Sequence, residues 1–352
     1  MLLRILTIPV ISTATLSLVC VVVLAGRHQA DSGCVTTLDA QDALDVVGKR
    51  SSEQPMLRRE PITPLVGKHD LPRSKVMLGK LLFNDVRLSG NNTLSCASCH
   101  NVSEGGDDGR PGSLGIDGQI GGLNAPTVLN SSLSIAQFWD GRAKDLYEQA
   151  PGPIHNPIEM GSNWDEVISK LNRDHDFVQE FRSVYPGGIT ADSIVDAIVA
   201  YEFALVTVDS PFDLYLKGDD DALSSDALDG YRLFKSAGCI SCHQGQLVGG
   251  NMFQTFGVMK DFDDRFDASS ELSNGRLNVT QRESDLHRFK IPSLRNVQLT
   301  APYFHDGGTA SLEEAIRIMA EFQLGESFSD KEIARIRAFL VSLTGQVEED
   351  LR

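Results

Sequence analysis

The stretches Cys96-Ala-Ser-Cys99-His100 and Cys239-Ile-Ser-Cys242-His243 repeat one pattern in the two halves of the chain. Two cysteines on one helical turn can reach both vinyl groups of a single porphyrin, and the next histidine then points at the iron. A zinc site would need two such cysteine pairs to share one metal, and a redox motif would occur once, in a βαβ context. The repeat therefore predicts two covalently attached c-type haems, with His100 and His243 as the proximal iron ligands.

The N-terminus carries the pattern of an export signal. Arg4 precedes a mostly apolar run from Ile5 to Ala25, and Val23-Leu24-Ala25 would suit cleavage by a signal peptidase. The run is also just long enough to span a bilayer, so residues 1–26 are interpreted either as a signal peptide or as a membrane anchor. Because c-type haem is attached outside the cytoplasm in bacteria, we expect a periplasmic protein, free or tethered.

The composition narrows the class of partner. The chain has 352 residues, enough for two domains with separate cores. Its formal net charge of −16 argues against nucleic acid and favours basic or neutral partners. Cys20 and Cys34 are the only cysteines outside the two motifs, so no disulfide framework can be built. The composition leaves the choice between monomer and homodimer open.

The chain divides at its composition changes. Residues 27–70 are polar and rich in charge and proline, which predicts a linker or a wrapping arm. The two motifs divide the rest into an N-terminal haem domain, 71–215, and a C-terminal haem domain, 216–345. Residues 101–130 are dense in glycine and aspartate and predict a long loop, which in a compact domain is usually functional.

Helical patterns dominate both halves. Apolar residues at helical spacing predict helices over 74–83, 163–185, 190–206 and 225–237. Capping boxes at Ser311 and Ser329 open two more, and the second is expected to close at Gly345. Strand signals are scarce. The predicted fold class is mainly α, with two cytochrome c-like haem domains and long connecting loops.

Further motifs surround the two pentapeptides. They are Leu78-Gly-Lys-Leu-Leu-Phe83, Leu88-Ser-Gly90, Asn124-Ala-Pro-Thr127, Phe138-Trp-Asp-Gly-Arg142, Gln149, Pro157-Ile-Glu-Met160, Ser293-Leu-Arg-Asn296, Tyr303-Phe-His-Asp-Gly307 and a helix that carries Met319. Together they resemble the bacterial di-haem cytochrome c peroxidases and their relative MauG. The resemblance implies an enzyme that reduces hydrogen peroxide to water with electrons from a small cytochrome c or a cupredoxin.

In that family the N-terminal haem is the peroxide site and the C-terminal haem accepts electrons. The resemblance gives His100 to the first haem and pairs His243 with Met319 on the second. A thioether opposite an imidazole raises the potential of a haem, as suits electron entry. Trp139 matches the segment between the two haems. Without the resemblance, Met319 would be interpreted as a core residue and Trp139 as a buried interface aromatic.

Glu159 matches the family's catalytic acid/base. A carboxylate over an open iron site can take a proton from one peroxide oxygen and return it to the other. Gln149 and Pro153 match distal-pocket positions, where an amide could orient peroxide and a proline could shape the cavity. From the pattern alone, Glu159 would be a solvated loop residue.

Three other residues match a calcium site between the domains of the family. The Asn124 side-chain amide and the carbonyls of Thr300 and Pro302 would supply hard oxygen ligands. Because few carboxylates take part, the resemblance implies that waters complete the shell.

One position departs from the peroxidase pattern. Many members carry a loop histidine that caps the peroxide haem in the oxidised enzyme, and the corresponding residue here is Ile116, which cannot bind iron. We therefore expect the first haem to be open at rest. His155 is the alternative ligand nearby, although loop histidines are more often surface or hydrogen-bonding residues.

An open haem is also typical of a protein-modifying branch, MauG and the methanobactin-associated MbnH, whose members oxidise residues of a partner protein. MauG has a tyrosine at the position of Met319 and a tryptophan at that of Ala237, which separates this chain from MauG itself. Three hypotheses follow: a peroxide reductase, an oxidase of Trp or Tyr residues in a docked protein, and a di-haem electron carrier.

Overall fold

The structure is a computed structural model that describes residues 57–67, 70–267 and 269–352. The predicted signal or anchor, 1–26, and most of the predicted arm, 27–70, lie outside these residues. Within the described ranges no helix has both the length and the apolar character needed to cross a membrane.

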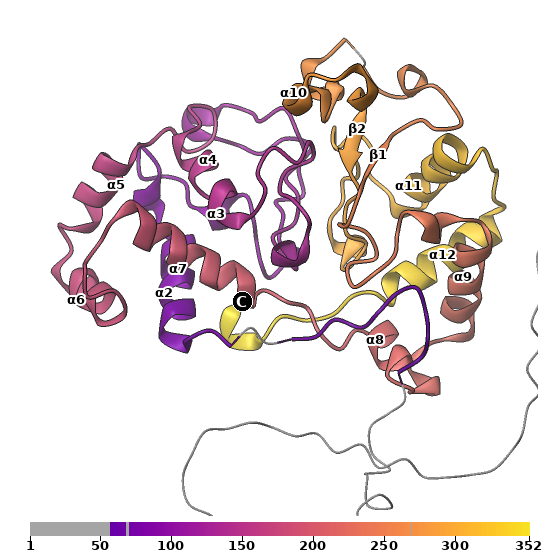
Figure 1. The fold of residues 1–352 in the computed structure, drawn as a ribbon, viewed down its shortest axis with the longest axis horizontal. Helices are drawn as coiled ribbons and strands as arrows, with labels where there is room; N and C mark the ends of the chain where they lie inside the picture. The colour runs from indigo at the N-terminus through magenta and orange to yellow at the C-terminus, as the bar shows by residue number, and fades with distance from the viewer. Residues whose placement is uncertain (1–56, 68–69, 268) are drawn as a thin grey trace, which may run out of the picture. The chain divides into compact units, whose positions relative to one another are not determined.

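Helices form most of the regular structure, which confirms the mainly α prediction (Figure 1). The helices are α2 Arg73–Phe83, α3 Leu146–Gln149, α4 Pro151–His155, α5 Trp164–Leu171, α6 His175–Val184, α7 Ala191–Ala204, α8 Pro211–Leu216, α9 Ser225–Ser236, α10 Leu277–Thr280, α11 Leu312–Met319 and α12 Asp330–Val341. Two short antiparallel strands, β1 Phe253–Thr255 and β2 Arg288–Lys290, pair in the second half. Long loops with 3₁₀ turns connect these elements.

Two helix boundaries differ from the prediction. The helix expected over 163–185 is two helices, because Asn172 caps the end of α5 and the Asp174 carboxylate accepts a hydrogen bond from Phe177 N at the start of α6. The helix opened by Ser329 ends at Val341 and not at Gly345. In the first case polar capping ended a pattern that apolar spacing alone would have continued, and in the second Ser342 caps the helix three residues before the glycine.

Each half has its own core, built around one close helix pair. A Cβ atom on Gly79 would lie 1.9 Å from Ala197 O, so only glycine allows α2 to approach α7 this closely. The same holds for α9 and α12, where a Cβ on Gly230 would lie 1.9 Å from Arg335 O. The two glycines thus allow the same kind of helix contact in each half.

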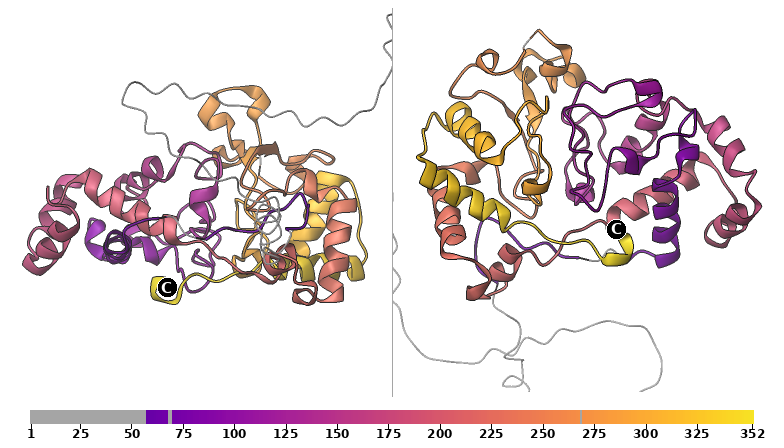
Figure 2. Two further views of the ribbon diagram at one scale, coloured as in Figure 1. Left: turned by 60° about the horizontal axis from the view of Figure 1, so that its bottom comes forward. Right: turned by 180° about the vertical axis from the view of Figure 1, so that it is seen from behind.

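The first described residues and the C-terminal residues cross between the two cores (Figures 1 and 2). Ile62, which precedes the first half in sequence, is fully buried in the second core. In return, Val347 and Leu351 pack into the first core, where the Tyr201 hydroxyl donates to Leu351 O at 2.6 Å. The described part of the arm and the C-terminal residues therefore each stabilise the half that is distant in sequence.

A buried ion pair fixes the arm. Arg295 lies 2.8 Å from Asp213, and both side chains are fully buried. Arg295 also donates to Thr63 O at 3.1 Å and to Gln246 O at 2.8 Å, and Asp213 accepts from Leu65 N. One guanidinium thus joins the arm, α8 and the loop after the second haem motif.

Candidate functional site

The second haem motif follows directly from the end of α9. Gly238, with φ of 97°, stops the helix, and Cys239–Ser241 form a 3₁₀ turn that presents His243. The His243 Nδ1 atom lies 3.1 Å from Val248 O, which orients the ring and leaves Nε2 for iron. Burial lowers the pKa of His243 to about 4, so the imidazole is neutral, as an iron ligand must be.

A cavity of about 340 Å³ opens beside this motif. Its walls include both cysteines of the motif, His243 and, at the end of α11, Met319. The helix changes to a π turn, Ala320–Leu324, immediately after Met319, a feature common at functional sites. The mostly apolar lining, two thiols, an imidazole and a thioether on one cavity fit a haem c.

The first motif is held by the loop that follows it. Ser95 N donates to Ser98 Oγ at 3.0 Å across the Cys96–Ser98 turn, and the His100 Nδ1 atom lies 3.2 Å from Gly106 O. The same backbone contact on Nδ1 leaves Nε2 of His100 available, as in the second motif. Burial lowers the pKa of His100 below its ordinary value.

Glu159 lies on a loop that folds back over α4. The carboxylate accepts a hydrogen bond from Asn156 Nδ2 at 2.7 Å and lies close enough to Cys99 to affect that thiol electrostatically. Burial raises the pKa of Glu159. Pro153 O accepts from Met160 N, which fixes the fold of the loop, and Gln149, half-buried, ends α3.

Ile116 contributes an apolar side chain to the same region. It is 8% exposed, and its Cδ1 fills the space that side chains on Gly90 and Gly161 would occupy. Ile116 N donates to Glu159 O at 2.7 Å, so the loop and the candidate acid/base are directly connected. His155 is exposed. Its Nδ1 atom lies 3.2 Å from Ser162 O and its ring packs edge-on against Trp164, contacts that indicate a structural role for this histidine.

Trp139 contacts residues of both halves. Its Nε1 donates to Asn124 O at 2.9 Å, and its carbonyl accepts from Lys290 N at 2.8 Å. The indole lines the second cavity and meets His305 edge-on at 6.4 Å. The structure therefore brings Trp139 to the second haem cavity and to the segment 124–127 that supports the first motif loop.

The predicted calcium ligands are partly brought together. Asn124 Nδ2 donates to Pro302 O at 2.6 Å and to Phe304 O at 3.1 Å, while the Thr300 hydroxyl donates to Val297 O. Asn124 Oδ1 is buried without a hydrogen-bond partner among the described residues.

Sequence reasoning missed several buried polar groups at these sites. Lys290 and His305 line the second cavity, where burial lowers their pKa values to about 8 and about 4. Glu202 on α7 lies near Cys96, and burial raises its pKa to about 8. Asp107 is 3% exposed. Lys290 could have been noticed as a lone charge between Phe289 and Ile291, but nothing in the pattern marks the others.

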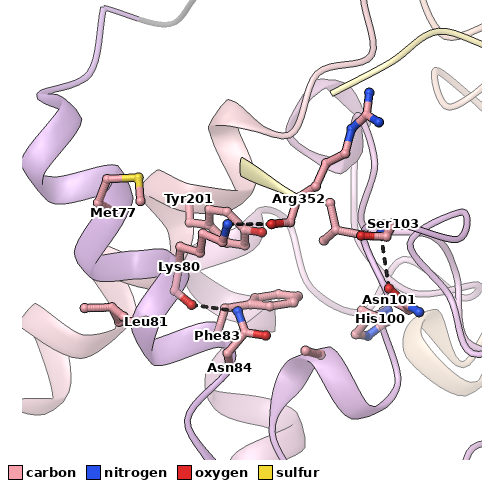
Figure 3. A pocket seen from close by; sticks show the side chains of 12 residues that line it. Met77, Lys80, Leu81, Phe83, Asn84, His100, Asn101, Ser103, Tyr201 and Arg352 are labelled. Atoms are coloured by element: carbon pink, nitrogen blue, oxygen red, sulfur yellow. Dashed lines mark hydrogen bonds between the residues drawn. The ribbon is translucent and has the colours of Figure 1, made fainter. Parts of the chain in front are cut away.

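Another pocket, of about 380 Å³, adjoins the first motif (Figure 3). Lys80 Nζ donates to the carbonyls of Asp350 and Arg352 there, so the C-terminal residue forms part of its wall. Ala97 and His100 of the first motif line this pocket, whereas Glu159 and Gln149 do not.

The fold and the two motifs define a di-haem c-type protein, and comparisons with known proteins agree. Residues 73–221 match the family of di-haem cytochrome c peroxidases. Cytochrome c peroxidase Ccp of Escherichia coli is 46% identical over 292 residues, covering 83% of this chain and 62% of that protein. Cytochrome c551 peroxidase of Nitrosomonas europaea is 46% identical over 291 residues, covering 82% of this chain and 86% of the relative.

Among solved structures, a MauG-like protein associated with microbial copper homeostasis matches with a TM-score of 0.71 at 29% identity, covering 86% of this chain and 96% of the other. The chain belongs to the di-haem cytochrome c peroxidase family of oxidoreductases.

Proposed function

We propose that the protein reduces hydrogen peroxide to water with electrons from a small periplasmic cytochrome c or cupredoxin, using one cytochrome c-like domain for each step. The observation that carries this proposal is the difference between the two motifs. A half-buried carboxylate, Glu159, accompanies the first, whereas a thioether, Met319, shares the cavity of the second. The two haems, when bound, supply the irons that cleave the peroxide bond and store electrons.

Glu159 moves the proton. Its carboxylate takes a proton from one peroxide oxygen and delivers it to the other, which leaves as water. Asn156 Nδ2 holds Oε1, and burial keeps the carboxyl protonated to higher pH than an exposed glutamate. Gln149 orients the bound peroxide through its amide.

Electrons enter at the second cavity and pass by Trp139. Its hydrogen bond to Asn124 O and its place in the cavity wall support this route. The proposed protein is exported, with residues 1–26 as signal or anchor, and binds one calcium ion at Asn124, Thr300 and Pro302.

The second candidate is an oxidase of Trp or Tyr residues in a partner protein. Ile116 favours it, since no protein ligand would need to leave the first iron, and so does the likeness to a MauG-like structure. The 46% identity with two peroxidases and the thioether at position 319 favour the first candidate.

Cyanide titration of the oxidised protein as purified tests the proposed asymmetry. We expect one cyanide per pair of haems without prior reduction, because His243 and Met319 would both bind one iron, whereas Ile116 would offer the other iron no ligand. The measurement is the change in the Soret absorption. No binding would indicate a di-haem electron carrier, and two equivalents would show that Met319 is not a ligand.

The control variant is Ile116→His. The backbone N–H of residue 116 donates to Glu159 O, and an imidazole side chain at this position is expected to abolish cyanide binding by the oxidised protein. If the variant binds cyanide as the native protein does, the loop does not face the first iron.

A further inference from the structure

Two buried side-chain oxygens lack a hydrogen-bond partner among the described residues and lie on neighbouring loops. They are Asp107 Oδ2 and Asn124 Oδ1, on side chains that are 3% and 5% exposed. Burying a carboxylate oxygen without a partner is costly, so a group that satisfies it is expected.

Three segments meet around these oxygens. Loop 105–109 packs on segment 299–301: a Cβ on Gly105 would lie 2.7 Å from Leu299 O and 2.9 Å from Asp107 Oδ1, and one on Gly109 would lie 3.7 Å from Ala301 O. The Thr127 hydroxyl donates to Gly105 O at 2.6 Å, which ties the loop to the segment that carries Asn124.

The Asn124 amide points at carbonyl oxygens. Its Nδ2 faces Pro302 O and Phe304 O at 2.6 and 3.1 Å. A half-turn of the amide, which exchanges nitrogen and oxygen, would bring Oδ1 beside these two carbonyls. Three neutral oxygens would then converge, a set suited to a hard cation but without a negative charge.

Asp107 can supply that charge. Backbone N–H groups of Asp107 and Gly109 act on its carboxylate, and Oδ2 has no hydrogen-bond partner among the described residues. The carboxylate also acts electrostatically on the Tyr303 phenol, so Asp107 lies near the 299–304 segment.

We propose that Asp107 is the anionic ligand of a Ca²⁺ ion held by loop 105–109, Asn124 and segment 299–304. This inference deepens the calcium site proposed above. Flexible loops rich in carbonyls favour Ca²⁺ over Mg²⁺, which demands stricter octahedral geometry. The described ranges contain no group of three or more His, Cys, Asp or Glu side chains that could hold a metal ion, so a transition-metal site does not compete there.

The test is calorimetric titration of chelator-treated holoprotein with CaCl₂, and with MgCl₂ for comparison. Asp107→Asn is expected to weaken calcium binding about 10- to 100-fold. The matched control is Glu104→Gln, which should bind calcium as the native protein does. Glu104 is exposed next to this loop, and within the described part of the chain its side chain accepts a hydrogen bond from Asn101.

Thermal unfolding distinguishes a ligand from a merely structural carboxylate. Without calcium, Asp107→Asn should be at least as stable as the native protein, since it removes an unpaired buried charge, and calcium should raise its Tm less. Native-like calcium affinity in Asp107→Asn, or a much lower Tm of its calcium-free form, would overturn the assignment. Absence of calcium binding by the native protein would overturn the whole site, and peroxide turnover tests the proposed function independently.

Discussion

Replacing Glu159 by glutamine is expected to lower kcat for peroxide reduction by about 10²- to 10⁴-fold, the usual contribution of a positioned acid/base. Glutamine keeps the size and the contact with Asn156 but cannot accept or return a proton. The loss should fall on kcat more than on KM, because proton transfer belongs to the chemical step. Stopped-flow and steady-state kinetics with reduced cytochrome c measure it.

The pH profile gives a second signature of Glu159. Burial raises its pKa, so the carboxyl is protonated, and unable to act as the initial base, to higher pH than an ordinary glutamate. Turnover by the native protein should therefore rise with pH through a pKa above the ordinary value of 4.5, and this limb should vanish in Glu159→Gln. Glu180→Gln, an exposed change on α6, is the control. Near-native kcat in Glu159→Gln would exclude the proposed role.

Replacing Arg295 by methionine is expected to destabilise the protein by about 3–5 kcal/mol, because Asp213 would remain as an uncompensated buried charge. The arm would also lose the hydrogen bond at Thr63 O. Guanidinium unfolding followed by circular dichroism gives the free energy of unfolding, with two-state behaviour checked by a second probe.

The double variant Arg295→Met/Asp213→Asn isolates the cause. Removing both charges should restore part of the loss, whereas two independent packing defects would add. Arg317→Met breaks an exposed pair with Asp330 and should cost under about 1 kcal/mol. Equal effects of Arg295→Met and Arg317→Met would contradict the account of the buried pair.

Local sequence patterns predicted the helices better than they predicted which segments pack against one another. These helix starts could be predicted because their signals lie in residues close together in the sequence. The signals are the side-chain caps Thr190 and Ser329 and the apolar spacing of α7. The packing of Ile62 and Leu351 into the cores that are distant in sequence could not be predicted, because the sequence pattern of neither segment indicates which core it contacts. The cap at Asp174 was present in the sequence but outweighed by apolar spacing on both sides.

The site followed the same rule. The haem motifs carry their chemistry in five consecutive residues, whereas the roles of Glu159 and Met319 came from resemblance, since a lone glutamate or methionine has no diagnostic spacing. Burial of Asp107, Lys290 and Glu202 arises from contacts between segments far apart in sequence. Such groups can be identified only from the tertiary structure, which shows which side chains are buried and which lack hydrogen-bond partners.

The central claim is that the two haem sites divide one reaction, peroxide cleavage at the first and electron entry at the second. Steady-state oxidation of a reduced small cytochrome c by hydrogen peroxide, started with the oxidised enzyme as purified, tests it most directly. The account predicts sustained turnover from the first seconds, two cytochromes oxidised per peroxide, without a reductive lag. A protein that consumes peroxide but oxidises the cytochrome only slowly, while holding a stable oxidised state, would contradict the peroxidase assignment in favour of oxidation of a partner protein.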